Sequence, residues 1–157
     1  MTVVRASTHR SRVRGSEALP GVVLGLGLGG FVDGILLHQV LQWHSLIAAR
    51  RSRETLSGLE ANVLADGLFH VATWVLVAVG LALLLRASRA AGVSARPLVG
   101  WMLVGWGVFN VLDSILFHWL LGLHHIRMGE HELAYDLAFF AFGLALIAGG
   151  WAVARRR

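Results

Sequence analysis

Four long apolar stretches, separated by shorter polar segments, make up most of this chain. They cover about residues 21–43, 62–85, 98–121 and 133–153. Each has about 21 to 24 residues, and at ~1.5 Å per residue a helix of that length crosses a hydrocarbon core of ~30 Å. The pattern predicts an all-α integral membrane protein, with a short basic tail at residues 1–20 and a single four-transmembrane-helix bundle over residues 21–157.

The first and third stretches share the same polar positions. Residues 33–44 read DGILLHQVLQWH and residues 113–124 read DSILFHWLLGLH. Residues 30–44 and 110–124 agree at six of fifteen positions, of which one is Asp and two are His. Similarity by chance between apolar segments would match leucines rather than all three polar positions. Because Asp66 and Asp136 also align, we predict two tandem helical-hairpin repeats, about residues 21–85 and 98–153, with a pseudo-two-fold axis along the membrane normal.

Composition and charge agree with a membrane protein and predict its orientation. Hydrophobic residues make up 56% of the chain, and the mean hydropathy is +0.66. All 14 basic residues are arginine; ten lie in the two ends and the connection between stretches two and three, and four lie in the other two connections. The positive-inside rule then predicts that both termini are cytoplasmic. Because the arginines are spread over ends and connections, they indicate topology and lipid contact rather than nucleic-acid binding.

In this orientation the ionisable side chains gather toward the outer face. The helical rise places one layer, with a residue from each helix, roughly 7–9 Å below the outer helix ends. Ionisable groups in hydrocarbon cost several kcal/mol unless they are paired, hydrated or coordinated. A divalent cation would satisfy this layer, since two carboxylates cancel its charge and neutral imidazoles complete its shell. The expected metal ligands are His38, Asp66, His118 and Asp136.

Further ionisable residues lie on both sides of that layer. The deeper ones are expected to orient the ligands or to form a second site; they are Asp33, His70 and Asp113. The shallower ones are expected to be outer ligands or to line the route by which an ion enters; they are His44, His124, His125 and His131. The alternative for the whole set is interhelical hydrogen bonding that only holds the helices together.

The spacing of Asp33 and His38 poses a geometric problem. Five residues turn a straight α-helix by ~140°, so the two side chains do not share a face. Either two sites exist at different depths, or a π-bulge brings positions five apart into line. Gly34 would ease such a bulge in the first stretch, whereas the aligned Ser114 is less permissive.

The types of donor atom in these side chains narrow the choice of metal but do not identify the activity. The chain has no cysteine, and histidine with carboxylate favours zinc, iron, manganese or copper(II) over copper(I). Metal handling or respiratory metalloprotein assembly is the leading hypothesis. Three alternatives stay open. The protein could be a metal-dependent membrane-embedded hydrolase, an ion or proton transporter, or a protein that binds haem through two axial histidines, such as His38 and His118. The formation of a homo-oligomer also stays open.

One segment resembles a known family. Residues 29–44, GGFVDGILLHQVLQWH, are similar to the motif GGFxDGIxLHQxLQWH of a bacterial domain-of-unknown-function family of small predicted membrane proteins. The runs ADGLFH at residues 65–70 and DSILFH at residues 113–118 support the resemblance, which covers all four stretches. The resemblance implies a multi-pass protein of the bacterial plasma membrane and an association with respiratory-oxidase assembly proteins. It implies no established activity.

Overall fold

Helices make up most of the chain that the structure, a computed structural model, describes, which is residues 17–156. Helix α2 (Ala18–Val32) continues into the π-helix η1 (Asp33–Val40), and α3 spans Leu56–Ala91. Helix α4 (Ala95–Asp113) continues into the π-helix η2 (Ser114–Leu120), and α5 spans Glu132–Arg155. Residues 17–156 contain no strand, which confirms the all-α class. Most of the predicted basic tail, with His9, lies outside the described residues.

Four helical segments are long and apolar enough to cross a membrane: Ala18–Val40, Leu56–Ala90, Ala95–Leu120 and Glu132–Arg155. Each overlaps one of the predicted apolar stretches. Helix α3 is longer than its stretch, since it begins where the Thr55 side chain accepts a hydrogen bond from the Gly58 N–H and ends at Gly92, whose φ is 73°. A hydroxyl at the N-cap is a common helix start, and glycine adopts the positive φ after the last turn without a steric penalty.

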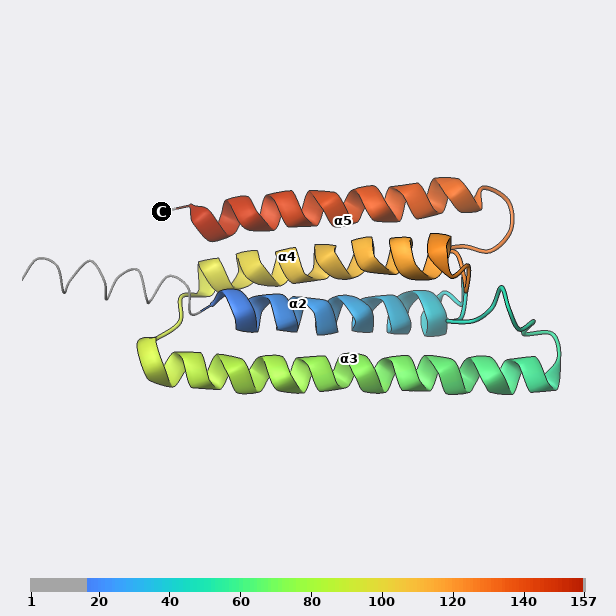
Figure 1. Ribbon diagram of the computed structural model, residues 1–157, viewed down its shortest axis with the longest axis horizontal. Helices are drawn as coiled ribbons and strands as arrows, with labels where there is room; N and C mark the ends of the chain where they lie inside the picture. The colour runs from blue at the N-terminus through green and yellow to red at the C-terminus, as the bar shows by residue number, and fades with distance from the viewer. Residues whose placement is uncertain (1–16, 157) are drawn as a thin grey trace, which may run out of the picture.

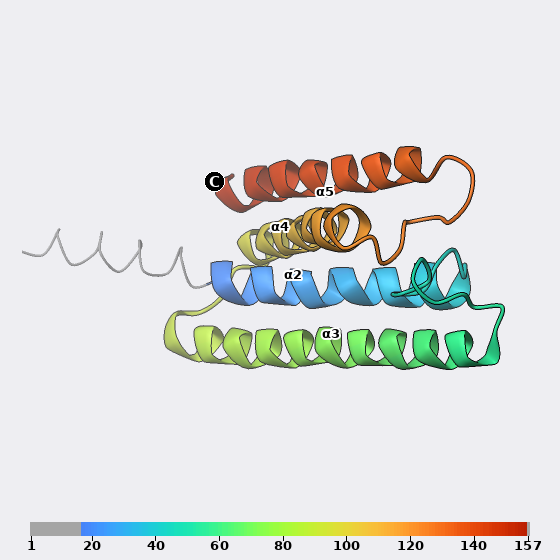
Figure 2. The ribbon, with the colours of Figure 1, turned by 45° about the vertical axis from the view of Figure 1, so that its right-hand side comes forward.

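The four helices form an inner and an outer pair. Helix α2 packs against α3 and α4, and α4 packs against α5, so that α3 and α5 lie on opposite sides of the α2–α4 pair (Figures 1 and 2). In the most apolar window of each span, 50% of residues are buried in the α2 span and 39% in the α4 span, but only 11% in those of α3 and α5. The outer helices therefore turn most of their apolar surface away from the protein, as lipid contact requires.

Small residues let the inner pair approach closely. A Cβ on Gly25 would lie 2.0 Å from the Met102 carbonyl oxygen, and a Cβ on Gly105 would lie 2.1 Å from the Val22 carbonyl oxygen. Both distances are too short for any side chain, so each glycine fits against the backbone of the other helix. The two glycines are 80 residues apart, the same spacing that separates the two polar motifs.

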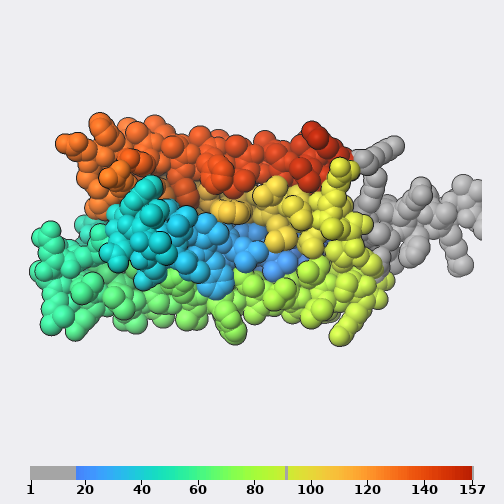
Figure 3. Space-filling view, turned by 180° about the vertical axis from the view of Figure 1, so that it is seen from behind, coloured from blue at the N-terminus to red at the C-terminus, as the bar shows by residue number. Residues whose placement is uncertain are grey.

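The connections divide the protein into two unlike ends. The start of α2, the end of α5 and the short α3–α4 connection lie together, and the Glu17 carboxylate accepts a hydrogen bond from the Ser94 N–H there. The two long connections, residues 41–55 and 121–131, lie at the opposite end (Figure 1). Seen from behind, the first of them covers this end between α3 and α5 (Figure 3).

Candidate metal centre

Both inner helices change to π-helical hydrogen bonding just before the end that carries the long connections. The Leu41 N–H donates to the Leu36 carbonyl at 2.8 Å, and the Leu121 N–H donates to the Leu116 carbonyl at 2.9 Å. Bonding between residues five apart places side chains five apart on one face. The His38 Nε2 consequently lies 3.2 Å from an Asp33 oxygen. The structure thus shows the π-helical alternative, over eight and seven residues, rather than a straight α-helix.

Ser114 fits the second π-helix despite its side chain. Its hydroxyl donates to the Asn110 carbonyl at 2.8 Å, and the residue is fully buried. A serine that bonds the carbonyl four residues back competes with regular helix geometry. Ser114 thus allows the π-helix as Gly34 does, because its hydroxyl bonds a carbonyl just before the π segment. At Gly34, an added Cβ would lie 2.7 Å from the His70 Nε2.

A left-handed residue ends each π-helix and turns the chain back. Gln42 has a φ of 51° and Gly122 a φ of 54°, and the next residue in each case donates its N–H to a carbonyl six residues earlier. The reversal brings His44 back over His38, with ring centroids 4.4 Å apart. It brings His124 over His118 in the same way, at 4.8 Å.

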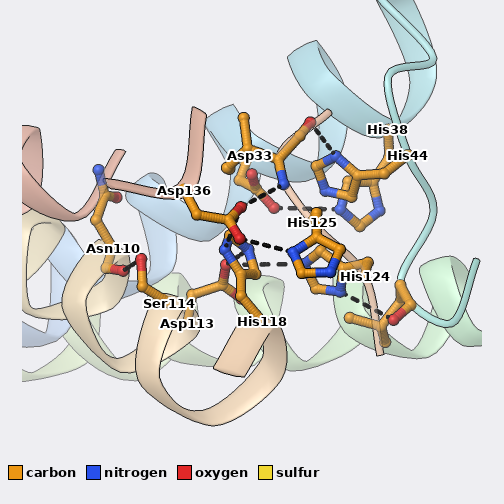
Figure 4. Close-up of polar contacts among 12 residues, drawn as sticks. Asp33, His38, His44, Asn110, Asp113, Ser114, His118, His124, His125 and Asp136 are labelled. Carbon is orange, nitrogen blue, oxygen red and sulfur yellow. Dashed lines mark hydrogen bonds and ion pairs between the residues drawn. The ribbon is translucent and has the colours of Figure 1, made fainter. Parts of the chain in front are cut away.

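Six buried side chains meet where the two inner helices end (Figure 4). We call this set the inner cluster; it consists of Asp33, His38, His44, Asp113, His118 and His124. Two groups of three have potential ligand atoms within 4.8 Å of one another: His38, His44 and His124 form one, and Asp113, His118 and His124 form the other. Each residue of the inner cluster is at most 4% exposed. The arrangement therefore offers nitrogen and oxygen donors in a volume closed to solvent.

Three of the four imidazoles of the inner cluster are hydrogen-bonded through Nδ1, and the Nδ1 of the fourth, His118, lies next to a carboxylate. The His44 Nδ1 bonds the Ile126 carbonyl at 2.8 Å, and the His124 Nδ1 bonds the Leu46 carbonyl at 3.0 Å. Because a carbonyl only accepts, each of these Nδ1 atoms must carry a hydrogen, which leaves a lone pair on Nε2 when the ring is neutral. The Nε2 atoms of His44 and His124 are buried and have no hydrogen-bond partner.

His38 and His118 are held by carboxylates instead. The His38 Nδ1 lies 2.9 Å from Asp66 Oδ1, and the His118 Nδ1 lies 2.9 Å from Asp136 Oδ1. Only the first of these contacts has hydrogen-bond geometry. On the other side of each ring, Nε2 lies 3.2 Å from an Asp33 oxygen and 3.0 Å from an Asp113 oxygen, respectively, but outside hydrogen-bond geometry. Each ring therefore turns its Nε2 toward the inner cluster.

The structure groups the residues differently from the sequence expectation of a four-residue layer. Asp66 and Asp136 lie behind the rings of His38 and His118 and accept hydrogen bonds from the Leu46 N–H at 2.7 Å and the Ile126 N–H at 3.0 Å. They tie the long connections to α3 and α5. The carboxylates that reach the Nε2 atoms belong to Asp33 and Asp113, because the π-helices rotate them toward His38 and His118.

Three other histidines of the expected set lie outside the inner cluster. The His70 Nδ1 bonds the Asp66 carbonyl at 2.7 Å, within the same helix. His131 is exposed and occupies the N-cap of α5. His125 contacts Asp136 and Glu132 and is 28% exposed at its side chain. The carbonyls of Leu46 and Ile126, which hold two rings, were not found from the sequence, since main-chain groups leave no residue-type signal.

His44 lies beyond the membrane-crossing segment of α2 and η1. Burial, and then the nearby rings of His124 and His38, lower the pKa of His44 to about 2. The side chain is therefore neutral near pH 7, which is the form that binds a metal.

A cavity of about 690 Å³ opens beside the inner cluster and is lined by both His38 and Asp66. Arg50 and Arg53 also line it; their guanidinium groups donate to the Leu121 carbonyl at 2.6 Å and the Gln42 carbonyl at 3.3 Å. Cations at the carbonyl end of a helix are favourable. These contacts give two of the arginines on the predicted outer side a structural role that is independent of topology.

A family model described as "Predicted membrane protein (DUF2243)" matches residues 20–157. No curated protein and no solved structure matches the chain.

Proposed function

The chain belongs to the DUF2243 family of predicted membrane proteins, and we propose that it is a metal-binding protein whose inner cluster holds one or two divalent transition-metal ions. One observation carries the proposal: four buried imidazoles lie together beside two buried carboxylates. Three of the rings are hydrogen-bonded through Nδ1, the Nδ1 of the fourth lies 2.9 Å from Asp136, and the Nε2 atoms of His38 and His118 lie next to Asp33 and Asp113. A histidine that ligates a metal almost always gives its other nitrogen to a carboxylate or carbonyl in this way.

The burial of the inner cluster supports a bound cation over simple hydrogen bonding between helices. Asp33 Oδ1, Asp113 Oδ2 and the Nε2 atoms of all four rings are buried without a hydrogen-bond partner. Leaving one buried polar group unpaired costs about 1–3 kcal/mol. If hydrogen bonding were the only purpose, the unpaired atoms should be scattered, whereas five of the six residues that carry them, all but Asp33, belong to the two groups of potential metal ligands. A metal ion would use them as ligands.

Charge limits how many ions the cluster can hold. Four carboxylates are buried at or beside it, those of Asp33, Asp66, Asp113 and Asp136. With neutral imidazoles, their charges balance at most two divalent cations. Nitrogen and oxygen donors without sulfur favour zinc, iron, manganese or copper(II).

The recurrence of the contacts favours a duplicated hairpin as the origin of the cluster. Asp33–His38 and Asp113–His118 have nearly equal separations, 3.2 and 3.0 Å, as do His38–Asp66 and His118–Asp136. In the orientation that the positive-inside rule predicts, both termini are cytoplasmic and the cluster lies near the outer leaflet of the plasma membrane. The protein would thus accept or release its ion at the outer face, as metal handling or respiratory metalloprotein assembly requires.

The geometry favours ion binding over the alternative activities. A hydrolase needs a metal-bound water that faces its substrate, but His38 is the one residue of the inner cluster that lines this cavity. A haem between axial histidines needs separated rings, whereas the His44 and His124 rings stack with centroids 4.6 Å apart. Phe69 and Phe139 also stack on His38 and His118, at 5.6 and 6.0 Å.

Elemental analysis tests the proposal. The protein is purified in detergent without chelator, and its metal content is measured before and after loading with Zn²⁺, Mn²⁺ or Fe²⁺ and desalting; an absorbance spectrum detects haem. We expect one or two ions per chain that survive desalting. A protein that holds no metal after loading, while remaining folded by circular dichroism, overturns the proposal.

A further inference from the structure

The two hairpins differ on the outer side of the inner cluster. His125 follows His124 in the position where Ser45 follows His44, and Glu132 precedes Asp136 by four residues where Asn62 precedes Asp66. The second hairpin thus adds an imidazole and a carboxylate next to an aspartate that both hairpins have.

The added groups contact that aspartate directly. The His125 Nδ1 lies 2.6 Å from Asp136 Oδ2, and the His125 Nε2 lies 3.6 Å from Glu132 Oε2. The other oxygen of Asp136 lies 2.9 Å from the His118 Nδ1. The side chains of His125 and Glu132 are 28% and 35% exposed, whereas that of Asp136 is 1% exposed. One carboxylate therefore joins the buried inner cluster to groups that reach the outside (Figure 4).

We propose that His125 and Glu132 form an outer metal site, which captures a divalent transition-metal ion from the outer side and passes it by way of Asp136 to the inner cluster. The inference rests on the proposed function of that cluster. Two ligands at ~2.1 Å from a tetrahedral ion lie about 3.4 Å apart, close to the observed 3.6 Å between Nε2 and Oε2.

The hydrogen bonds of Glu132 leave one of its oxygens free for this role. Its Oε1 accepts from the Gly129 N–H at 2.9 Å, which fixes the carboxylate over the connection. A carboxylate in the first turn of α5 also complements the helix dipole, but that role needs neither Oε2 nor an imidazole opposite it. In the first hairpin, the Asn62 amide donates to the carbonyls of Arg51 and Gly58. Capture is therefore assigned to the second hairpin alone.

The first hairpin supplies the residues for a test. The double variant His125→Ser, Glu132→Asn gives the second hairpin the residues that the first one has at the same places. Metal-free full-length protein in detergent is mixed with Zn²⁺, and uptake is followed by competition with a chromophoric chelator. A control variant, Glu130→Gln, His131→Ser, removes the same groups from the same connection without touching Asp136.

We expect the double variant to reach the wild-type content of tightly bound zinc, to lose one weakly bound ion, and to load more slowly by roughly tenfold or more. The control variant should load at the wild-type rate. If the double variant takes up zinc as fast as wild type and keeps the weak ion, the outer site is refuted while the inner cluster stands. If wild type binds no zinc, the proposed function fails first, and the outer site with it. If the double variant does not fold, the single variants Glu132→Gln and His125→Ser are judged by the same uptake rate.

Discussion

The imidazole rings of His44 and His124 stack with centroids 4.6 Å apart and planes 4° apart. Each ring is fixed by the main chain of the other connection, since His44 bonds the Ile126 carbonyl and His124 bonds the Leu46 carbonyl. Neither ring can therefore be placed without the other hairpin. The inner cluster is a joint product of both halves of the chain, which explains why each half carries the same polar spacing.

Replacing either stacked histidine should damage the centre to a similar degree. His44→Ala and His124→Ala each remove one Nε2 and leave a carbonyl oxygen without its donor, at a cost of about 1–3 kcal/mol. We expect both variants to lose most of their bound metal and to melt at a lower temperature, measured by elemental analysis and thermal unfolding in detergent. His70→Phe, which introduces the residue found at the aligned Phe140, should retain metal. A large difference between His44→Ala and His124→Ala would contradict joint construction.

The two kinds of aspartate should behave differently. Asp66 and Asp136 hold the Nδ1 side of His38 and His118, so Asp66→Asn and Asp136→Asn should weaken metal affinity by roughly 10–100-fold without changing the content at saturation. Asp33→Asn and Asp113→Asn should lower the content itself, because they remove ligands. Zinc titrations against a competing chelator separate the two effects. If instead Asp66→Asn and Asp136→Asn lower the metal content and the other two variants lower only the affinity, the ligands are the four-residue layer expected from the sequence.

Part of this centre was predictable from sequence and part was not. The repeated Asp–His–His spacing contains all six residues of the inner cluster, but the sequence assigns only His38 and His118 among them to the expected layer of metal ligands. The five-residue separation of Asp33 and His38 already required two sites or a π-bulge. What sequence could not provide was the direction in which each ring points. That direction depends on main-chain carbonyls and on the left-handed backbone of Gln42 (φ 51°), a conformation that is uncommon for a residue other than glycine. A sequence interpretation that lacks this left-handed turn places His44 at the membrane interface, apart from the other residues of the inner cluster.

Orientation in the membrane is open to direct labelling. Ten of the 14 arginines lie at the ends and in the connection between the second and third spans, so a reporter fused after Arg157 should be cytoplasmic. A small tag inserted near Gly129 should react with a reagent that does not cross the membrane. The opposite labelling would move the inner cluster to the cytoplasmic leaflet and remove its access from outside.

The protein should not conduct ions. Towards the end where α2 begins and α5 ends, the described helices hold no ionisable side chain over residues 18–32, 71–85, 98–112 and 137–154. A proton or metal path needs polar groups across the whole bilayer, and here they occupy one side only. Liposomes that contain the protein should show no sustained flux of protons or zinc above empty liposomes. Flux that Asp33→Asn abolishes would show that the chain carries a complete path.

X-ray absorption spectroscopy of the zinc-loaded protein tests the metal centre most directly. The account predicts nitrogen and oxygen ligands at about 2.0–2.2 Å, with the multiple-scattering pattern of imidazole, and loss of that pattern in the double variant His44→Ala, His124→Ala. Spectra that show only water-like oxygen ligands, or that are unchanged in the double variant, would contradict it. The buried histidines and aspartates would then only hold the helices together.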